Sequence, residues 1–128
     1  MIYLDSSVAL AHLFGEGRSP PAALWRQTVS SSRLLEYEVW NRVHARGLTQ
    51  SHTAEARALL GQVALIELAP QILARALEPF PTPVRTLDAL HLASLAHLWG
   101  QGQEIALASF DKRLIAGARA LGIPLFDV

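Results

Sequence analysis

The chain has 128 residues, 51% of them hydrophobic, with 11 basic residues against 11 acidic ones and no cysteine. This length and apolar content are typical of one domain with a sizeable core, here residues 1–128, and the lack of cysteine excludes disulfides and thiolate metal sites. Because no apolar run reaches membrane-spanning length and no signal-peptide pattern opens the chain, we expect a cytoplasmic protein without membrane contact.

The balance of charge also limits how the chain can bind nucleic acid. Proteins that bind by neutralising phosphates alone normally carry a basic excess. Here Lys112 is the only lysine, and arginine supplies the other basic residues. If the chain binds nucleic acid, something other than net charge must hold the phosphates, and bound metal ions are one such source of positive charge.

The first half of the chain opens with a short strand and continues mainly with helices. Ile2, Tyr3 and Leu4 are an apolar, β-prone run that ends at Asp5, typical of a strand buried on both faces of a parallel sheet. Ser6 or Ser7 is expected to cap the helix that follows. The elements expected in this half are a helix to Phe14, a helix over 21–27, a strand over 28–31, a helix from the serines at 30–32 to Gly47, and a helix over 49–61.

Strand and helix patterns alternate in the second half. A stiff connector with Pro79, Pro81 and Pro83 precedes an apolar helix that begins at about Thr86, is predicted to be deeply packed and ends at Gly100. The other expected elements are a strand over 63–68, a helix over 70–78, a strand over 104–109, a helix over 110–121 and a last strand over 123–128. The alternation favours an α/β fold in which helices cover both faces of a parallel sheet.

Four acidic residues fall where a sheet of this kind would bring them together. They are Asp5 at the end of the first strand, Glu38 on the helix after the serines, Asp88 in the first turn of the apolar helix, and Asp111 in the turn after the strand 104–109. Ligands of open α/β sheets bind outside the carboxyl ends of the strands. Crowded carboxylates repel one another, and a divalent cation such as Mg²⁺ or Mn²⁺ removes that repulsion. The pattern therefore favours a metal site.

Each of these residues also has a purely structural interpretation. Asp5 and Asp111 can cap the helices that follow them, and Asp88 can stabilise its helix through the helix dipole. Glu38 can be a surface residue, since Glu36 lies two positions away and the two cannot face the same side. The helical wheel does not decide between the two glutamates, because it puts Glu36 within the apolar arc and Glu38 at its flank.

The order and spacing of four segments resemble a known family. The segments are MIYLDSS, SSRLLEYEVWNRV, RTLDALHLASL and ASFDKRLIAGARALGI. Together they resemble the PIN-domain ribonucleases, and most closely the VapC-like toxins of toxin–antitoxin pairs. The resemblance covers almost the whole chain, and TLDALHLA is its most specific piece. It implies a PIN-like three-layer α/β/α sandwich with a central, mostly parallel sheet of four to five strands.

The resemblance also implies which residues form the site. The family's acidic quartet falls on Asp5, Glu38, Asp88 and Asp111. Glu36 has no counterpart in that quartet, so the resemblance selects Glu38, and Ser109 takes the hydroxyl position that accompanies the last aspartate. The three aspartates would contact the metal, and Glu38 would orient the attacking water or hold a second ion.

The activity implied by the resemblance is that of a Mg²⁺- or Mn²⁺-dependent endoribonuclease, which hydrolyses RNA phosphodiesters by in-line attack. Ser6, at the mouth of the site, and Arg85 and Arg113, which lie close to Asp88 and Asp111 in the sequence, are candidate substrate-binding residues. The implied partners are an RNA substrate, an antitoxin whose terminal segment covers the acidic pocket, and a second copy of the chain in a homodimer formed through apolar helices.

The chain also offers alternatives to this site and function. His91 lies one helical turn from Asp88, but no further ligand stands at a fixed spacing, so a buried, hydrogen-bonded imidazole is the better interpretation than a metal ligand. A haloacid-dehalogenase-like phosphatase would need a second aspartate at position 7, where Ser7 stands. A catalytically silent PIN-like binding module is the remaining alternative.

Overall fold

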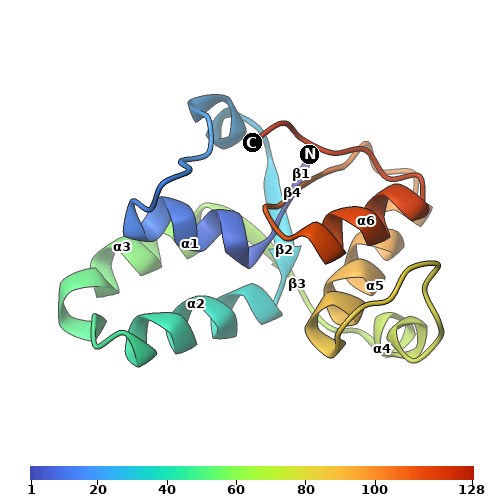
Figure 1. The fold of residues 1–128 in the computed structure, drawn as a ribbon, viewed down its shortest axis with the longest axis horizontal. Helices are drawn as coiled ribbons and strands as arrows, with labels where there is room; N and C mark the ends of the chain where they lie inside the picture. Colours follow the sequence, from blue (N-terminus) through green and yellow to red (C-terminus); the bar gives the residue numbers. More distant parts are fainter.

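The four strands form one parallel sheet in a computed structural model that describes residues 1–128 (Figure 1). The strands are β1 (Ile2–Leu4), β2 (Val29–Ser32), β3 (Val63–Ile66) and β4 (Ala106–Ala108), in the order β3-β2-β1-β4 across the sheet. In the centre, Ile2 of β1 lies opposite Val29 on one side and Ala106 on the other. Because the strands are parallel, their carboxyl ends share one edge of the sheet, and Asp5 follows β1 at that edge.

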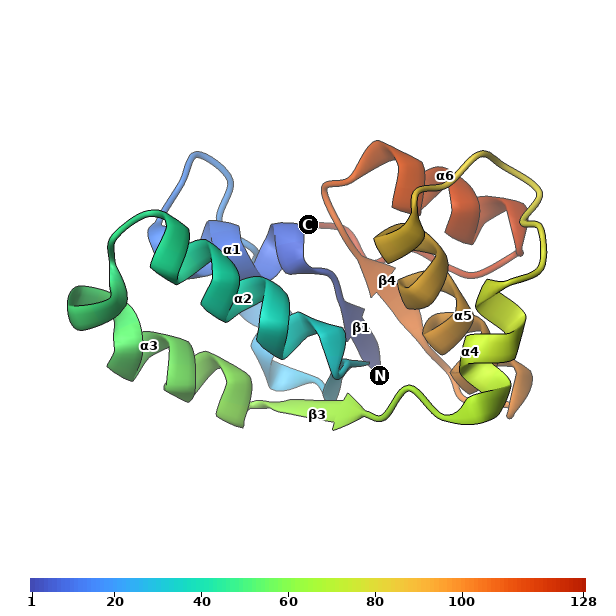
Figure 2. The ribbon, with the colours of Figure 1, turned by 90° about the horizontal axis from the view of Figure 1, so that it is seen from below.

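Helices cover both faces of the sheet, as Figure 2 shows. One face carries α1 (Ser6–Phe14), α2 (Leu34–Ala45) and α3 (Thr49–Gly61), and the other carries α4 (Pro70–Ala76), α5 (Thr86–Gly100) and α6 (Lys112–Ala120). A short 3-10 helix, η1 (Ala22–Arg26), precedes β2. None of the helices is long and apolar enough to cross a bilayer. The predicted three-layer α/β/α sandwich around a parallel sheet is confirmed.

The core has two halves, and β1 contributes to both. Ile2 and Leu4 belong to a cluster of 13 buried residues that includes Val8 and Val39, from α1 and α2. Tyr3, between them, belongs to a second cluster of 8 buried residues with partners on α5, α6 and β4. This is the period-two alternation of a strand with both faces covered. The central strand therefore joins the two helical layers directly below the acidic edge.

The predicted last strand over 123–128 is wrong. Only Leu125 bridges to Leu107, through hydrogen bonds from the Leu107 N–H to the Pro124 carbonyl at 2.9 Å and from the Phe126 N–H to the Leu107 carbonyl at 2.8 Å. Proline has no N–H, so Pro124 cannot supply the next bond of the ladder toward the start of β4. The segment therefore touches the edge of the sheet without extending it.

The structure decides between the predicted caps of two helices. Asp5, and not Ser6 or Ser7, caps α1, because its carboxylate accepts the Ser7 N–H at 3.4 Å. The serines before α2 are buried within β2, where Ser31 Oγ donates to the Leu4 carbonyl at 2.7 Å, but Ser32 Oγ also accepts the N–H of Leu34, the first residue of α2, at 3.1 Å. Short hydroxyl side chains tolerate this burial because the neighbouring strand satisfies them.

α5 is buried along its middle, from His91 to Leu95, whereas Leu87 and Trp99 near its ends are exposed. A helix of 15 residues is about 22 Å long, and a strand of three residues is about 10 Å long. Both ends of the helix consequently extend past the sheet, so the predicted deep packing holds only for the central turns. Its first turn, with Asp88, stands at the acidic edge.

Candidate functional site

A pocket of about 570 Å³ opens at the carboxyl edge of the sheet, and only one of its 11 lining residues is hydrophobic. All four predicted acidic residues line it, together with the predicted substrate-binding residues Ser6, Arg85 and Arg113 and with four further residues, Arg42, Thr86, Leu87 and His91. The four carboxylates come from the end of β1, from α2, from the first turn of α5 and from the start of α6. The fold thus gathers residues that are up to 106 positions apart into one polar cavity.

Asp5 lies at the base of this pocket and is only 5% exposed. Its Oδ2 accepts hydrogen bonds from Ser7 Oγ at 2.5 Å and from Ser109 Oγ at 2.8 Å, whereas its Oδ1 accepts none. Burial raises the pKa of the Asp5 carboxyl above its usual value, the Ser7 and Ser109 hydroxyls and the nearby His91 act to lower it, and the net shift is upward. Capping α1 and facing the pocket are therefore two roles of the same side chain.

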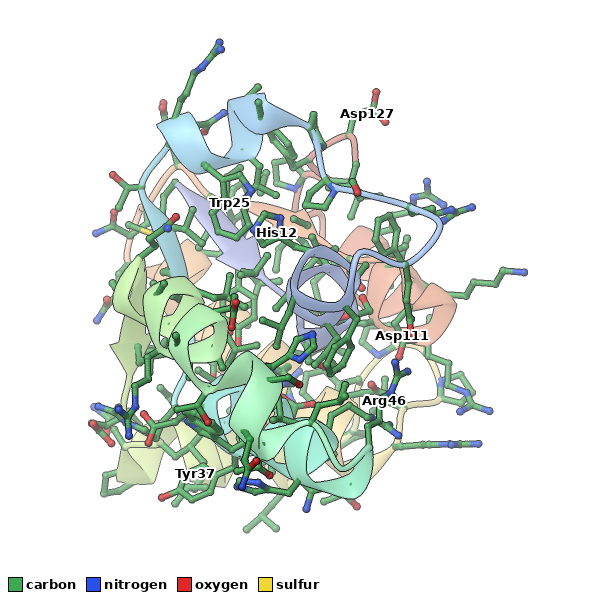
Figure 3. The ribbon with its side chains drawn as sticks, turned by 90° about the vertical axis from the view of Figure 1, so that its left-hand side faces the viewer. His12, Trp25, Tyr37, Arg46, Asp111 and Asp127 are labelled. Carbon is green, nitrogen blue, oxygen red and sulfur yellow. The ribbon has the colours of Figure 1, made fainter.

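Glu38 is the glutamate of α2 that reaches the pocket. Its Oε1 lies 2.5 Å from His91 Nε2, and its Oε2 accepts a hydrogen bond from Ser6 Oγ at 3.0 Å. Glu36 instead pairs with Arg33 at 3.0 Å and does not line the pocket. Tyr37, between the two glutamates, projects outward and is 66% exposed (Figure 3).

Asp88 and Asp111 both use one carboxylate oxygen to hold backbone N–H groups at the start of a helix. Asp88 Oδ2 accepts the Arg85 N–H at 3.2 Å. Asp111 Oδ1 accepts the N–H groups of Arg113 at 2.9 Å and Leu114 at 3.2 Å, so it is the N-cap of α6. These bonds fix each carboxylate and leave its other oxygen free for a ligand.

The aspartates form a donor set that suits a hard divalent cation. One oxygen of each accepts no hydrogen bond, namely Oδ1 of Asp5, Oδ1 of Asp88 and Oδ2 of Asp111. Carboxylate oxygens are the ligands that Mg²⁺ and Mn²⁺ prefer. No three acidic or histidine side chains stand close enough together to ligate one ion in their present positions. Binding would therefore require the aspartates to converge, whereas Glu38 has both oxygens engaged and is the least available ligand.

Ser109 does not line the pocket but lies behind Asp5. Its hydroxyl donates to Asp5 Oδ2 and accepts the Asp111 N–H at 2.9 Å, so it connects the first and last acidic residues of the predicted quartet. Ser7 makes a similar connection, because its Oγ donates to Asp5 Oδ2 and accepts the Phe110 N–H at 2.9 Å.

Sequence reasoning did not identify Ser7 or Arg42 as parts of this site. The signal available for Ser7 was its position two residues after an aspartate, where a side-chain turn is common. The interpretation of His91 as a buried, hydrogen-bonded imidazole is confirmed, since it is 2% exposed and both ring nitrogens are paired. Its partner Glu38 is 53 residues away, and no local pattern could reveal that contact.

Burial alone lowers the pKa of His91, but the hydrogen bond that His91 donates to Glu38 and the negative charges of Glu38, Asp5 and Asp88 outweigh it, and the net shift is upward. The imidazole therefore moderates the repulsion between the carboxylates. It does so from beneath the pocket, whereas Arg42, Arg85 and Arg113 stand around it.

Comparisons with known proteins show which family the chain belongs to. The family model for the PIN domain matches residues 2–120. Ribonuclease VapC47 from Mycobacterium tuberculosis is 30% identical over 129 residues, which cover 95% of this chain and 93% of that protein. A toxin–antitoxin complex from Klebsiella pneumoniae contains a chain of the same fold, with a TM-score of 0.66, 19% identity and 94% of both chains covered. The chain belongs to the PIN-domain family.

Proposed function

We propose that this chain is a metal-dependent endoribonuclease and the toxin of a toxin–antitoxin pair. Its membership of the PIN-domain family and its similarity to Ribonuclease VapC47 support this function. The observation that carries the proposal is the pocket in which Asp5, Glu38, Asp88 and Asp111 meet, with one oxygen of each aspartate uncommitted.

In this proposal, Asp5, Asp88 and Asp111 hold one or two Mg²⁺ or Mn²⁺ ions. When bound, such an ion lowers the pKa of a water molecule and neutralises charge on the phosphate. Glu38 orients the attacking water, since His91 and Ser6 fix its carboxylate on both sides. The water would lose a proton and attack phosphorus in line with the leaving ribose oxygen, the bond between phosphorus and that oxygen would break, and the oxygen would take up a proton from solvent.

The arginines of the pocket support binding of RNA. Arg42, Arg85 and Arg113 all line it, so three of the chain's 11 basic residues lie around the carboxylates. Guanidinium groups bind phosphate oxygens in bidentate geometry. Local positive charge at the site therefore takes the place of a basic excess over the whole chain.

Cleavage of a structured RNA mixture by the purified protein tests this function. We expect cleavage with Mg²⁺ or Mn²⁺ and none with EDTA. Asp88→Asn should lower the rate about 100-fold or more, because metal-assisted charge stabilisation contributes several kcal/mol. The matched control Asp127→Asn changes an exposed aspartate outside the pocket and should keep the rate of the original protein.

Two results would contradict the proposal in different ways. A folded protein that binds no Mn²⁺ would remove the aspartates from metal binding. A folded protein that binds Mn²⁺ but cleaves no RNA would favour the catalytically silent binding module, which the lack of a ready-made three-ligand site also favours.

We propose further that an antitoxin covers the acidic pocket and that the chain forms a homodimer through its apolar helices. Exposed apolar side chains on α4 and directly after it, Leu73 and Leu77, support an apolar contact with another chain. Sedimentation of the isolated chain should give a dimer mass at micromolar concentrations. A monomer mass throughout that range would exclude the homodimer.

A further inference from the structure

The buried chain of contacts behind Glu38 begins in the middle of the central strand. The Tyr3 hydroxyl of β1 lies 2.8 Å from His91 Nδ1, and the opposite ring nitrogen, His91 Nε2, lies 2.5 Å from Glu38 Oε1. Tyr3 and His91 are 88 positions apart in the sequence, and His91 and Glu38 are 53 apart. Three elements, β1, α5 and α2, therefore meet through side-chain hydrogen bonds at one point below the pocket.

The direction of these bonds follows from the partners of the Tyr3 hydroxyl. Its oxygen accepts the Ser32 N–H of β2 at 3.2 Å. A tyrosine hydroxyl carries its proton at neutral pH, and because the Tyr3 oxygen already accepts the Ser32 N–H, its own hydrogen is available for donation. His91 Nδ1 is its acceptor, which requires the hydrogen of the neutral imidazole to be on Nε2. That hydrogen points at Glu38.

We propose that Tyr3 and His91 are positioning residues that fix Glu38 in the pocket through this directed chain of hydrogen bonds. The inference rests on the proposed function and assigns two further residues to the same site. The imidazole is also fixed by packing, since the Tyr3 and His91 rings meet edge to face at 5.9 Å and 84°. With Ser6 holding its second oxygen, Glu38 has a donor on each side.

Such support matters because glutamate is a long, flexible side chain. Fixing it costs rotamer entropy, and a misplacement of about 1 Å can cost about 100-fold in rate. Tyr3 and His91 are almost completely buried and do not need to touch substrate. Their effect on cleavage acts through Glu38, which they hold at the distance and angle that the attacking water requires.

Nitrogen-15 NMR of the imidazole rings tests the chain of hydrogen bonds without metal or RNA. In the original protein at a pH where the ring is neutral, we expect His91 to carry its hydrogen on Nε2. In Tyr3→Phe, the Nδ1 resonance should move to the position of an imidazole nitrogen that carries no hydrogen and accepts no hydrogen bond. Tyr37→Phe, which removes the only other tyrosine hydroxyl, should leave the His91 resonances unchanged. A hydrogen on Nδ1 in the original protein, or no response to Tyr3→Phe, would overturn the proposal.

A pair of amide variants separates positioning from mere filling of the core. The glutamine amide nitrogen of His91→Gln can take the place of Nε2 and donate to Glu38, whereas the shorter side chain of His91→Asn reaches only the place of Nδ1. We expect His91→Gln to cleave RNA at least about tenfold faster than His91→Asn, with the difference in kcat and similar KM. Equal kcat in the two folded variants would overturn the proposal.

The two experiments keep this inference apart from the proposed function. If the original protein cleaves no RNA, the proposed function fails, but the NMR measurement still decides whether Tyr3 directs His91 toward Glu38. If the original protein cleaves RNA and the amide pair does not differ, the proposed function stands and the positioning role is wrong.

Discussion

Asp5→Asn is expected to abolish RNA cleavage and, at neutral pH, to make the fold more stable. The loss of activity follows from the loss of a carboxylate at the base of the pocket, and we expect a fall of about 100-fold or more. The gain in stability follows from the burial of Asp5, which is 5% exposed. Holding its charged carboxylate away from water costs free energy in the folded protein. Asparagine caps helices as well as aspartate does, and its oxygen can accept the same hydroxyls from Ser7 and Ser109.

The stability difference should depend on pH in a defined direction. The pKa of Asp5 is higher in the folded protein than in the unfolded chain, mainly because burial disfavours the charged form. Above the folded pKa, the buried charge destabilises the native state by a constant amount. As the pH falls through the folded pKa toward the unfolded value of about 4, the carboxyl takes up a proton and the difference disappears.

Thermal unfolding of both proteins from pH 8 to pH 4 measures this effect. At pH 7, we expect Asp5→Asn to be about 1 kcal/mol more stable, or roughly 4 °C higher in Tm. Asp127→Asn, at an exposed position, should show no such pH-dependent gain. A variant less stable than the original protein at pH 7 would mean that the hydrogen bonds from Ser7 and Ser109 and the attraction to His91 outweigh the desolvation.

Gly117→Val is expected to destabilise the fold by about 1–3 kcal/mol and to reduce cleavage. Gly117 faces α5, and a Cβ at this position would stand 2.5 Å from Leu92 Cδ1 and 3.3 Å from Leu92 Cδ2. Leu92 is completely buried in the second core cluster, and the close packing of protein interiors leaves such a side chain little room to move. The larger side chain must therefore push α6 away from α5.

This displacement should reach the site, because α5 carries Asp88 and α6 begins after Asp111. We expect a fall in cleavage of about tenfold or more, in addition to the lower denaturant midpoint. Gly61→Val is the matched control, since Gly61 ends α3 and a Cβ there would have no neighbour within 4 Å. Equal stability of the two valine variants would show that Leu92 yields at little cost.

The sequence predicted the layers of the fold because its signals are local. The apolar run before Asp5, the alternation of strand and helix patterns and the proline connector each act over a few residues, and all agree with the observed elements. The prediction of a last strand was wrong because Pro124 interrupts the hydrogen bonds that would pair this segment with β4. Whether two segments pair depends on both of them, and β4 is not part of the local pattern.

The candidate site was predictable only in part, for the same reason. The three aspartates stand at strand ends or helix starts, and these positions can be recognised along the chain. Glu36 and Glu38 could not be separated on a helical wheel, because the distinction depends on Arg33 on one side and His91 on the other. The partners of Ser7 and His91 likewise lie in segments that only the folded chain brings near.

The central place of β1 in the sheet has a consequence for synthesis of the protein on the ribosome. β1 leaves the ribosome before the other three strands, but the contact between Asp5 and Ser109 joins positions 104 residues apart, and β4 is the strand that closes that side of the sheet. Chains emerge from the N-terminus at about 5–20 residues per second, so the first strand waits several seconds for its last partner. A nascent chain that has not reached Asp111 lacks a wall of the pocket, so the acidic site cannot form until all four strands and the helices up to the start of α6 have emerged.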